Sequence, residues 1–529
     1  MKAVASLGLA LCASATFAAD SGDVACRTTI ECHKQAEAIG TTIHVPNVEG
    51  NTTSDIDRAE DIFYWTQKIN KASVVMLMEE KIFPPQTGQL IAKGIAYAVE
   101  QADKPGGKRP SDVIQHENLI TGKVGEEASV IHAGRSRQDM YATYRAAKLR
   151  NQFVDYTTSL LGLRERLLGL ATNHVETLIP AYTNGVQAVP ISYAHYLLAF
   201  EGSFARDVER SREAFKRLNR SAMGTAVLSN SVWPLNRPRL AQLLGFDGVI
   251  ENSLDASQIS PSDTSLEALA IASSGAIRIG ALTSDLHTQY HQVTPWFLLA
   301  EGRTYSSSAM PQKRNPGFIM RAREAASNVV GLAQTVTLRG HNVTTGMTDY
   351  KEPWADLAVF PAAVRMVAAT NAVLEALVVN PARALEELEA EWTTTMNLAE
   401  ILLRDHQIPF RIGHRFSSEL VSAARPSLTK PKDFSYTKAD QIFRQTLNHF
   451  KLPERALPMS EQAFRDALSA RRMVEETKGI GGPQPAEVRR MLEQANLRLL
   501  QDKVWVQNVR ARIQQADAQL EREFAKLLP

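Results

Sequence analysis

Cysteine, charge of one sign and strand-like patterns are all scarce in this sequence. Its 529 residues include three cysteines, and lysine and arginine are scattered, with a formal net charge of +2. Because neither the total charge nor any run is strongly basic, binding to nucleic acid or to a membrane surface is not expected. Alternating apolar and polar residues are rare, so a large sheet is not expected. Composition instead indicates a soluble globular protein, long enough for two or three packed units.

The first residues differ from the rest of the chain. Lys2 supplies a positive charge, residues 3–15 are almost all apolar or small, and Thr16-Phe17-Ala18 is a small-x-small triplet. This layout is typical of a secretory signal peptide, and the apolar run is too short to span a bilayer. We therefore expect residues 1–18 to be a signal peptide and the mature protein to be exported, either periplasmic or secreted.

Export would also account for the cysteines. Removing the signal peptide removes Cys12 and leaves Cys26 and Cys32, which are six positions apart. In an oxidising compartment such a pair is expected to form a disulfide, which would fix the N-terminal segment rather than a core. The alternative is two free thiols packed near the start of a helix.

Apolar residues recur with helical period over most of the chain. The longest near-continuous stretch of this pattern runs from roughly residue 140 to 380, and polar, turn-rich segments interrupt the chain on either side. These segments are 103–110, 424–433 and 479–483. Long central helices flanked by smaller helical units favour a helix bundle.

The segment from Ser306 to Pro316 has the residues of a carboxylate-binding loop. It contains three serines and two prolines, and helical periodicity begins only near Phe318. Lys313 supplies a compact positive charge and Asn315 a directional donor, both of which suit a carboxylate. The structural alternative is a solvated turn without function.

Three motifs resemble those of the fumarase/argininosuccinate lyase superfamily. The loop keeps serine-serine-x-methionine-proline-x-lysine-x-asparagine-proline, and only the preceding glycine differs, being Ser306. The run from His132 to Asp139 is similar to the argininosuccinate lyase run that meets the dicarboxylate end of the substrate, with Gln138 in place of an asparagine. Thr183 matches the threonine of a threonine-histidine pair. The resemblance extends from about residue 50 to 500.

This resemblance implies a fold and an assembly. The fold would be all-α, with three domains and a long central helix bundle, and the assembly a homotetramer with sites shared between subunits. The implied domains are an N-terminal helical domain at 19–133, a central bundle domain with the catalytic loop at 134–381, and a C-terminal helical domain at 382–529. No cofactor or metal is implied. His287 and His291 have metal-ligand spacing, but no third ligand is evident in the sequence.

The resemblance also implies a chemistry. Members of the family remove a proton next to a carboxylate and expel a group from the neighbouring carbon, and the product is fumarate. Ser307 matches the base, and Lys313 would activate it and stabilise the charged intermediate. The residues matched to substrate binding are Ser136, Arg137, Gln138, Thr183, Asn184, Asn315 and Lys351.

Two departures from the family concern the leaving group. The family pairs a histidine with a glutamate beyond the loop, and these positions are Asn184 and Met320 here. The group usually proposed to protonate the leaving nitrogen is therefore missing, and Glu324, one helical turn further, is a candidate substitute. A tyrosine and a glutamine that hold the amino-acid end of argininosuccinate become Val343 and Thr348.

The dicarboxylate half of the site is thus kept better than the arginine half. We expect a carbon–nitrogen lyase that releases fumarate from argininosuccinate or, with better support, from a related N-substituted aspartate. Two alternatives stay open. One is a superfamily cycloisomerase acting on a carboxylated muconate, which does not require the histidine, and the other is a catalytically silent binding protein with the lyase fold.

Overall fold

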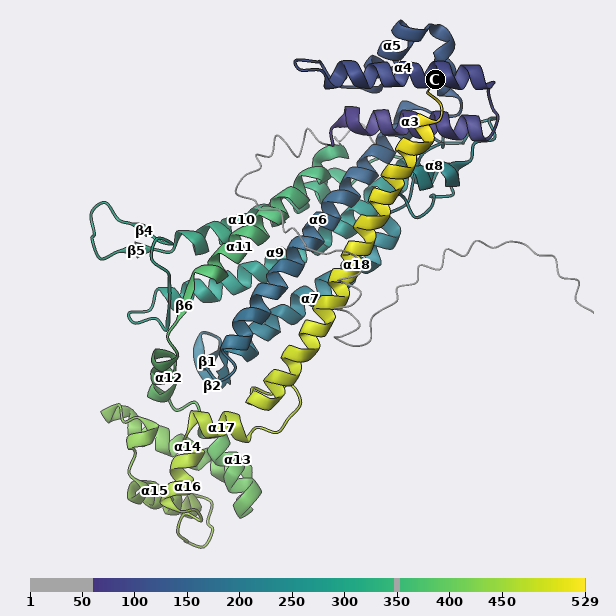
Figure 1. The fold of residues 1–529 in the computed structure, drawn as a ribbon. Coiled ribbons are helices and arrows are strands. Elements are labelled where there is room, and N and C mark those ends of the chain that lie inside the picture. Colours follow the sequence, from purple (N-terminus) through teal and green to yellow (C-terminus); the bar gives the residue numbers. More distant parts are fainter. Residues whose placement is uncertain (1–59, 347–352, 529) are drawn as a thin grey trace, which may run out of the picture.

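The computed structural model describes residues 60–346 and 353–528 of the chain (Figure 1). The regular structure of these residues is mostly helical, and the expected all-α fold class is confirmed. Their strands are short and form three two-stranded antiparallel pairs. The expected signal peptide, residues 1–18, and the expected disulfide of Cys26 and Cys32 lie outside the described residues.

One end of the molecule is a small helical unit with its own core. The carboxylates of Asp61 and Asp112 cap its first and third helices, accepting hydrogen bonds from Tyr64 N at 2.8 Å and Gln115 N at 2.9 Å. Apolar residues from distant parts of the chain complete the core, among them Leu240 and Phe524. The helices of this unit are α3 (Ile62–Glu79), α4 (Pro85–Asp103), α5 (Val113–Val124) and α8 (Arg237–Leu243).

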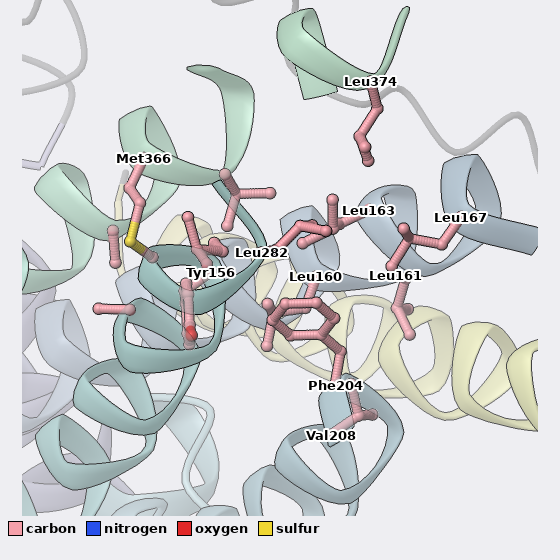
Figure 2. Close-up of a cluster of buried hydrophobic side chains, with 14 of the residues drawn as sticks. Tyr156, Leu160, Leu161, Leu163, Leu167, Phe204, Val208, Leu282, Met366 and Leu374 are labelled. Atoms are coloured by element: carbon pink, nitrogen blue, oxygen red, sulfur yellow. The ribbon is translucent and has the colours of Figure 1, made fainter. Parts of the chain in front are cut away.

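The centre of the molecule is a bundle of long helices (Figure 1). Its core is the largest apolar cluster of the described residues, and Figure 2 shows Leu160, Phe204, Leu282 and Met366 from four different helices meeting there. Burial of such side chains is the main source of stability of the bundle. The helices are α6 (Arg137–Asn173), α7 (Tyr193–Leu218), α9 (Ser260–Tyr290), α10 (Gly317–Gly340) and α11 (Val359–Ala376).

The last helix, α18 (Pro485–Ala525), joins the bundle to the small unit that contains α3. It runs along α6 and α7 and reaches the core beside α3 (Figure 1). Buried Arg164 of α6 donates to Asp502 of α18 at 2.6 Å and to Glu201 of α7 at 2.8 Å. The residues expected to form a C-terminal domain, 382–529, therefore include a helix that packs on the bundle. The division into 19–133, 134–381 and 382–529 stays a prediction.

A smaller helical unit lies at the other end of the bundle (Figure 1). Its core is built from apolar residues such as Leu402, Phe416, Phe443 and Phe464. The helices are α12 (Pro381–Ala390), α13 (Thr395–His406), α14 (Phe410–Ala424), α15 (Tyr436–His449), α16 (Glu461–Ala467) and α17 (Ala470–Glu476).

The strands connect the long helices at their ends. The first pair, β1 (Leu178–Thr183) and β2 (Val186–Ser192), follows α6 and precedes α7. The second pair is β3 (Phe297–Leu299) with β6 (Leu377–Val379), and the third is β4 (Tyr305–Ser306) with β5 (Arg314–Asn315).

Two long apolar segments of the described part stand out within the bundle. By length and composition alone, Asp255–Tyr290 and Ala355–Ala376 could cross a membrane. Half of each apolar window is buried inside the bundle, as in core helices of soluble proteins. Part of the other half lies on the surface, where Ala270, Ile277 and Ala281 of α9 recur at helical spacing and are exposed.

Candidate functional site

The serine-rich loop closes the β4–β5 hairpin just before α10 (Figure 1). Tyr305 pairs with Asn315 in the hairpin, and Asn315 Nδ2 donates to Tyr305 O at 3.1 Å. The hydroxyl of Tyr290, the last residue of α9, donates to Arg314 O at 3.1 Å. These contacts fix the base of the loop to the end of α9 and leave its tip exposed.

Ser307 is half-buried within this exposed loop. Its Oγ accepts hydrogen bonds from Ala309 N at 3.3 Å and Met310 N at 3.1 Å. Two N–H donors at one hydroxyl oxygen would stabilise the negative charge that the oxygen carries after losing its proton. Lys313 is exposed on the same loop, six residues further along.

The second predicted segment forms the N-terminus of α6. Ser136 caps the helix and forms a capping box with Asp139. The side chain of each residue accepts a hydrogen bond from the backbone N–H of the other. Arg137 is exposed at the first helical position and Gln138 follows it. A helix N-terminus favours negative charge, so an arginine fork there suits a carboxylate.

Thr183 and Asn184 lie at the exposed tip of the β1–β2 hairpin. Asn184 and Gly185 have φ angles of 52° and 79°, as in the two-residue turn that matches the twist of paired strands. Asparagine and glycine tolerate this backbone better than other residues. Tyr182 Oη donates to Glu387 Oε1 at 2.6 Å and ties the hairpin to α12. Burial and this carboxylate raise the pKa of Tyr182.

The predicted site residues lie at opposite ends of the helix bundle within one folded chain. Helix α6 has 37 residues, so Arg137 at its start lies about 55 Å from its end, where the Thr183 hairpin follows. Ser307 and Lys313 sit beyond the C-terminal end of α9, whose start packs near the start of α6. A single chain therefore brings Ser307 towards the Thr183 end and keeps it far from Arg137.

The segment that contains Lys351 lies outside the described residues. Its two flanks are fixed near the N-terminal end of α6. On one side Gly346 N donates to Gln258 Oε1 at 3.0 Å. On the other, buried Asp356 accepts from Arg145 at 2.6 and 2.9 Å.

Met320 and Glu324 lie on one face of α10, as their spacing predicts, and both are exposed. Met320 stands where the family has a glutamate, and it is 47% exposed in the chain. A methionine here needs no polar partner. Glu324 stays a candidate for the missing acid.

One of the two histidines with metal-ligand spacing has another partner. His287 Nδ1 lies 3.0 Å from Arg323 Nη1, and burial together with Arg323 lowers the pKa of His287. An arginine at this nitrogen competes with a metal ion for it. Within residues 60–346 and 353–528 no group of three or more potential ligands could hold a metal ion.

Comparison with known proteins gives the family. Residues 103–331 match the model of the lyase family. The argininosuccinate lyase of Geobacillus thermodenitrificans is 30% identical over 438 residues, which is 81% of this chain and 91% of the relative. That of Methanothermobacter thermautotrophicus is 29% identical over 449 residues, 84% of this chain and 94% of the relative. The chain belongs to the argininosuccinate lyase family.

A solved structure in the same superfamily is also similar. The crystal structure of EDDS lyase in complex with formate is 25% identical, with a TM-score of 0.81, and the match covers 90% of this chain and 94% of that one. As an argininosuccinate lyase family member, the chain is a carbon–nitrogen lyase that releases fumarate and acts on a small dicarboxylate. The expected carbon–nitrogen lyase is therefore confirmed over the alternative of a catalytically silent binding protein.

Family membership also corrects the expected location. The related argininosuccinate lyases are cytoplasmic enzymes of arginine biosynthesis, so the prediction of a periplasmic or secreted protein is wrong. That prediction rested on the composition of a short apolar run. Such a run is a weaker indication than similarity over four fifths of the chain, because many unrelated apolar segments share its composition.

Proposed function

We propose that this argininosuccinate lyase homologue cleaves the C–N bond of an N-substituted aspartate other than argininosuccinate, with Ser307 as the base. The observation that carries the role of Ser307 as the base is the geometry of the β4–β5 loop. The loop is exposed, is fixed at its base and presents Ser307 Oγ to two backbone N–H donors. Argininosuccinate itself is the second candidate substrate.

In the proposed reaction Ser307 Oγ takes a proton from the carbon next to a carboxylate of the substrate. The electron pair left on that carbon forms the double bond of fumarate as the bond from the neighbouring carbon to nitrogen breaks. The nitrogen leaves with the electron pair of that bond and takes up a proton, for which Glu324 is the candidate donor. Negative charge develops on the carboxylate during the first step, and Lys313 and Asn315 would stabilise it. One such donor is worth roughly 3 to 4 kcal/mol of barrier in well-organised sites.

The other carboxylate of the substrate would bind at the N-terminus of α6. Arg137 supplies a planar fork and Gln138 an amide, and the backbone N–H groups of the first turn add to the positive potential. The remaining residues proposed to bind substrate are Ser136, Thr183, Asn184 and Lys351.

A site that uses both Ser307 and Arg137 requires more than one chain. About 55 Å of helix separates Arg137 from the end at which Ser307 lies, so no small substrate can touch both in one chain. Copies packed in antiparallel fashion would place the start of one α6 beside the loop of another. Exposed Ala270, Ile277 and Ala281 on α9 offer a smooth apolar face for such packing. We therefore propose a homotetramer with sites shared between subunits.

The leaving group is the part of the substrate for which the site differs most from the family. Asn184 replaces the histidine and stands in a left-handed turn, and Met320 replaces the glutamate that would orient it. Val343 and Thr348 replace residues that hold the amino-acid end of argininosuccinate. EDDS lyase, whose structures contain formate and in one variant fumarate, supports a substrate with another amine.

The cycloisomerase alternative has only the fold in its favour. The β-carboxy-cis,cis-muconate cycloisomerase of Acinetobacter calcoaceticus is 14% identical with a TM-score of 0.62. At this identity the match supports a common fold and leaves the reaction open. Nothing in the site geometry favours ring closure over elimination.

The proposal is tested with a panel of substrates. The protein is incubated with argininosuccinate, EDDS and other N-substituted aspartates, and with a carboxylated muconate, while the absorbance of fumarate is followed. We expect fumarate from an N-substituted aspartate at a higher kcat/KM than from argininosuccinate. A higher kcat/KM for argininosuccinate would contradict the substrate proposal, and consumption of the muconate without fumarate would contradict the reaction.

A further inference from the structure

A buried carboxylate beside the proposed Arg137 site joins two segments that are far apart in the sequence. Asp139 lies three residues after the N-cap of α6 and is fully buried. Its Oδ1 accepts a hydrogen bond from Ser136 N at 2.8 Å. Its Oδ2 accepts from the backbone N–H groups of Gly224, Thr225 and Ala226, at 3.1, 3.0 and 3.1 Å. One oxygen therefore accepts a hydrogen bond from the N-cap of the helix, and the other accepts hydrogen bonds from the loop between α7 and α8.

The loop held by Asp139 has an unfavourable backbone. Ala226 and Val227 have φ angles of 45° and 81°, a left-handed conformation that a β-branched residue rarely adopts. Such residues persist only where the surrounding contacts fix them. Further along, the same loop packs closely on Gly134 in the turn before α6. A Cβ added to Gly134 would lie only 2.7 Å from Ser231 Oγ and 2.5 Å from Leu235 Cδ1, so the loop covers this turn.

The electrostatics of Asp139 show how closely it is enclosed. Burial raises its pKa to about 6, and the backbone donors and the positive charge of Arg135 oppose that rise. Arg237, at the start of α8, is the second cation whose charge interacts with it. Removing the carboxylate would leave three N–H groups of the loop without an acceptor, two of them buried, which is unfavourable.

We propose that Asp139 is a positioning residue of the reaction, which fixes residues 224–231 against the start of α6 and so holds Arg137 and Gln138 in the orientation that binds a substrate carboxylate. The inference rests on the proposed role of Arg137 in carboxylate binding. In the proposed shared site, Ser307 comes from another chain and Arg137 binds the carboxylate that is not next to the abstracted proton. Asp139 therefore acts on the binding of the dicarboxylate and leaves proton abstraction largely unchanged.

The test compares Asp139→Asn and Asp139→Ala with the wild type. Asparagine keeps the size of the side chain but has one acceptor oxygen, so either the helix or the loop donors lose their partner. The matched control is Asp112→Asn, since Asp112 caps α5 through Gln115 N without holding a second segment. Each protein is measured for fumarate binding by titration calorimetry, for kcat and KM on the most active substrate of the panel, and for hydrogen exchange in peptides covering 222–231.

Both Asp139 variants should bind fumarate about 10-fold more weakly, with KM raised to a similar extent and kcat within about 3-fold of the wild type. Exchange in 222–231 should be faster in both, and the Asp112 variant should match the wild type. Unchanged exchange would show that Asp139 does not hold the loop. Faster exchange with unchanged fumarate binding would show that the loop does not position the site. Either result overturns the inference.

A further variant separates this inference from the proposed function. If Arg137→Ala binds fumarate as the wild type does, the carboxylate-binding role of Arg137 fails. The exchange measurement still reports whether Asp139 holds the loop in that case. If Asp139→Ala does not fold, the asparagine variant carries both measurements, because it preserves the volume of the buried side chain.

Discussion

Ser307 is the residue on which the proposed reaction most directly depends. It is half-buried, and the two hydrogen bonds to its Oγ come from its own loop. Ser307→Ala should lower kcat at least about 10²-fold, because the base is lost, while the melting temperature stays close to that of the wild type. Steady-state kinetics and thermal unfolding check both statements.

The neighbouring serine supplies the control for this prediction. Ser308 is exposed on the same loop. Ser308→Ala removes the same atom one position away and should reduce kcat far less. Equal turnover of Ser307→Ala and the wild type would exclude Ser307 as the base.

His116 makes a prediction about pH. It is fully buried against Phe63, and among the described residues neither ring nitrogen has a hydrogen-bond partner. Burial lowers its pKa to about 4, so between pH 6.5 and 4 the unfolded chain binds a proton that the folded chain does not. This residue should therefore reduce the free energy of unfolding as pH falls through that range, by up to about 3 kcal/mol.

The measurement is urea unfolding of the wild type and His116→Phe at pH 4.5 and pH 7. Phenylalanine fills a similar space and does not titrate. The wild type should lose more stability than the variant on acidification, and the difference between the two losses isolates His116 from Asp139, whose raised pKa acts in the opposite direction. Equal losses would show that His116 is not held neutral.

At the scale of elements, one buried cation adds to the apolar contacts that hold α18 on the bundle. Arg164 is fully buried and pairs with Glu201 and Asp502. Arg164→Met should destabilise the fold by about 3 to 5 kcal/mol, because two carboxylates would stay buried without their main partner. Chemical unfolding of the variant and the wild type measures the difference.

A surface ion pair on the same helix is the matched control. Arg489 of α18 pairs with Glu176 at 2.7 Å, and both side chains are more than half exposed. Arg489→Met should change the free energy of unfolding by no more than about 0.5 kcal/mol. If the two methionine variants were equally stable, the buried network would not be what fixes α18 to the bundle.

At the scale of the whole molecule, the separation of Arg137 from Ser307 predicts that two inactive variants restore each other. Arg137→Ala and Ser307→Ala should each be nearly inactive alone. The two variants are mixed, unfolded and refolded together. About one site in four should then combine Arg137 from a Ser307→Ala chain with Ser307 from an Arg137→Ala chain. Activity of the mixture measures this, and light scattering should give the mass of four chains. A monomer at micromolar concentration, or a mixture as inactive as its parts, would contradict shared sites.

The sequence by itself determined the fold class and the family. Helical periodicity depends on local spacing, and the motif around Ser307 and Lys313 is a contiguous run, so both can be recognised without knowing what packs against what. Location was different, since a short apolar run has too little information to outweigh the family.

Only the tertiary structure decided how the segments are joined. Asp139 sits in a plain capping box in the sequence, and its three further donors come from a loop some 85 residues later. Likewise α18 packs on the bundle through contacts such as that of Arg164 with Asp502, 338 positions apart. Contacts at such separations depend on the packing of whole helices, and no local pattern encodes them. The distance between Arg137 and Ser307 follows from the same packing, and it makes one chain insufficient for the proposed site.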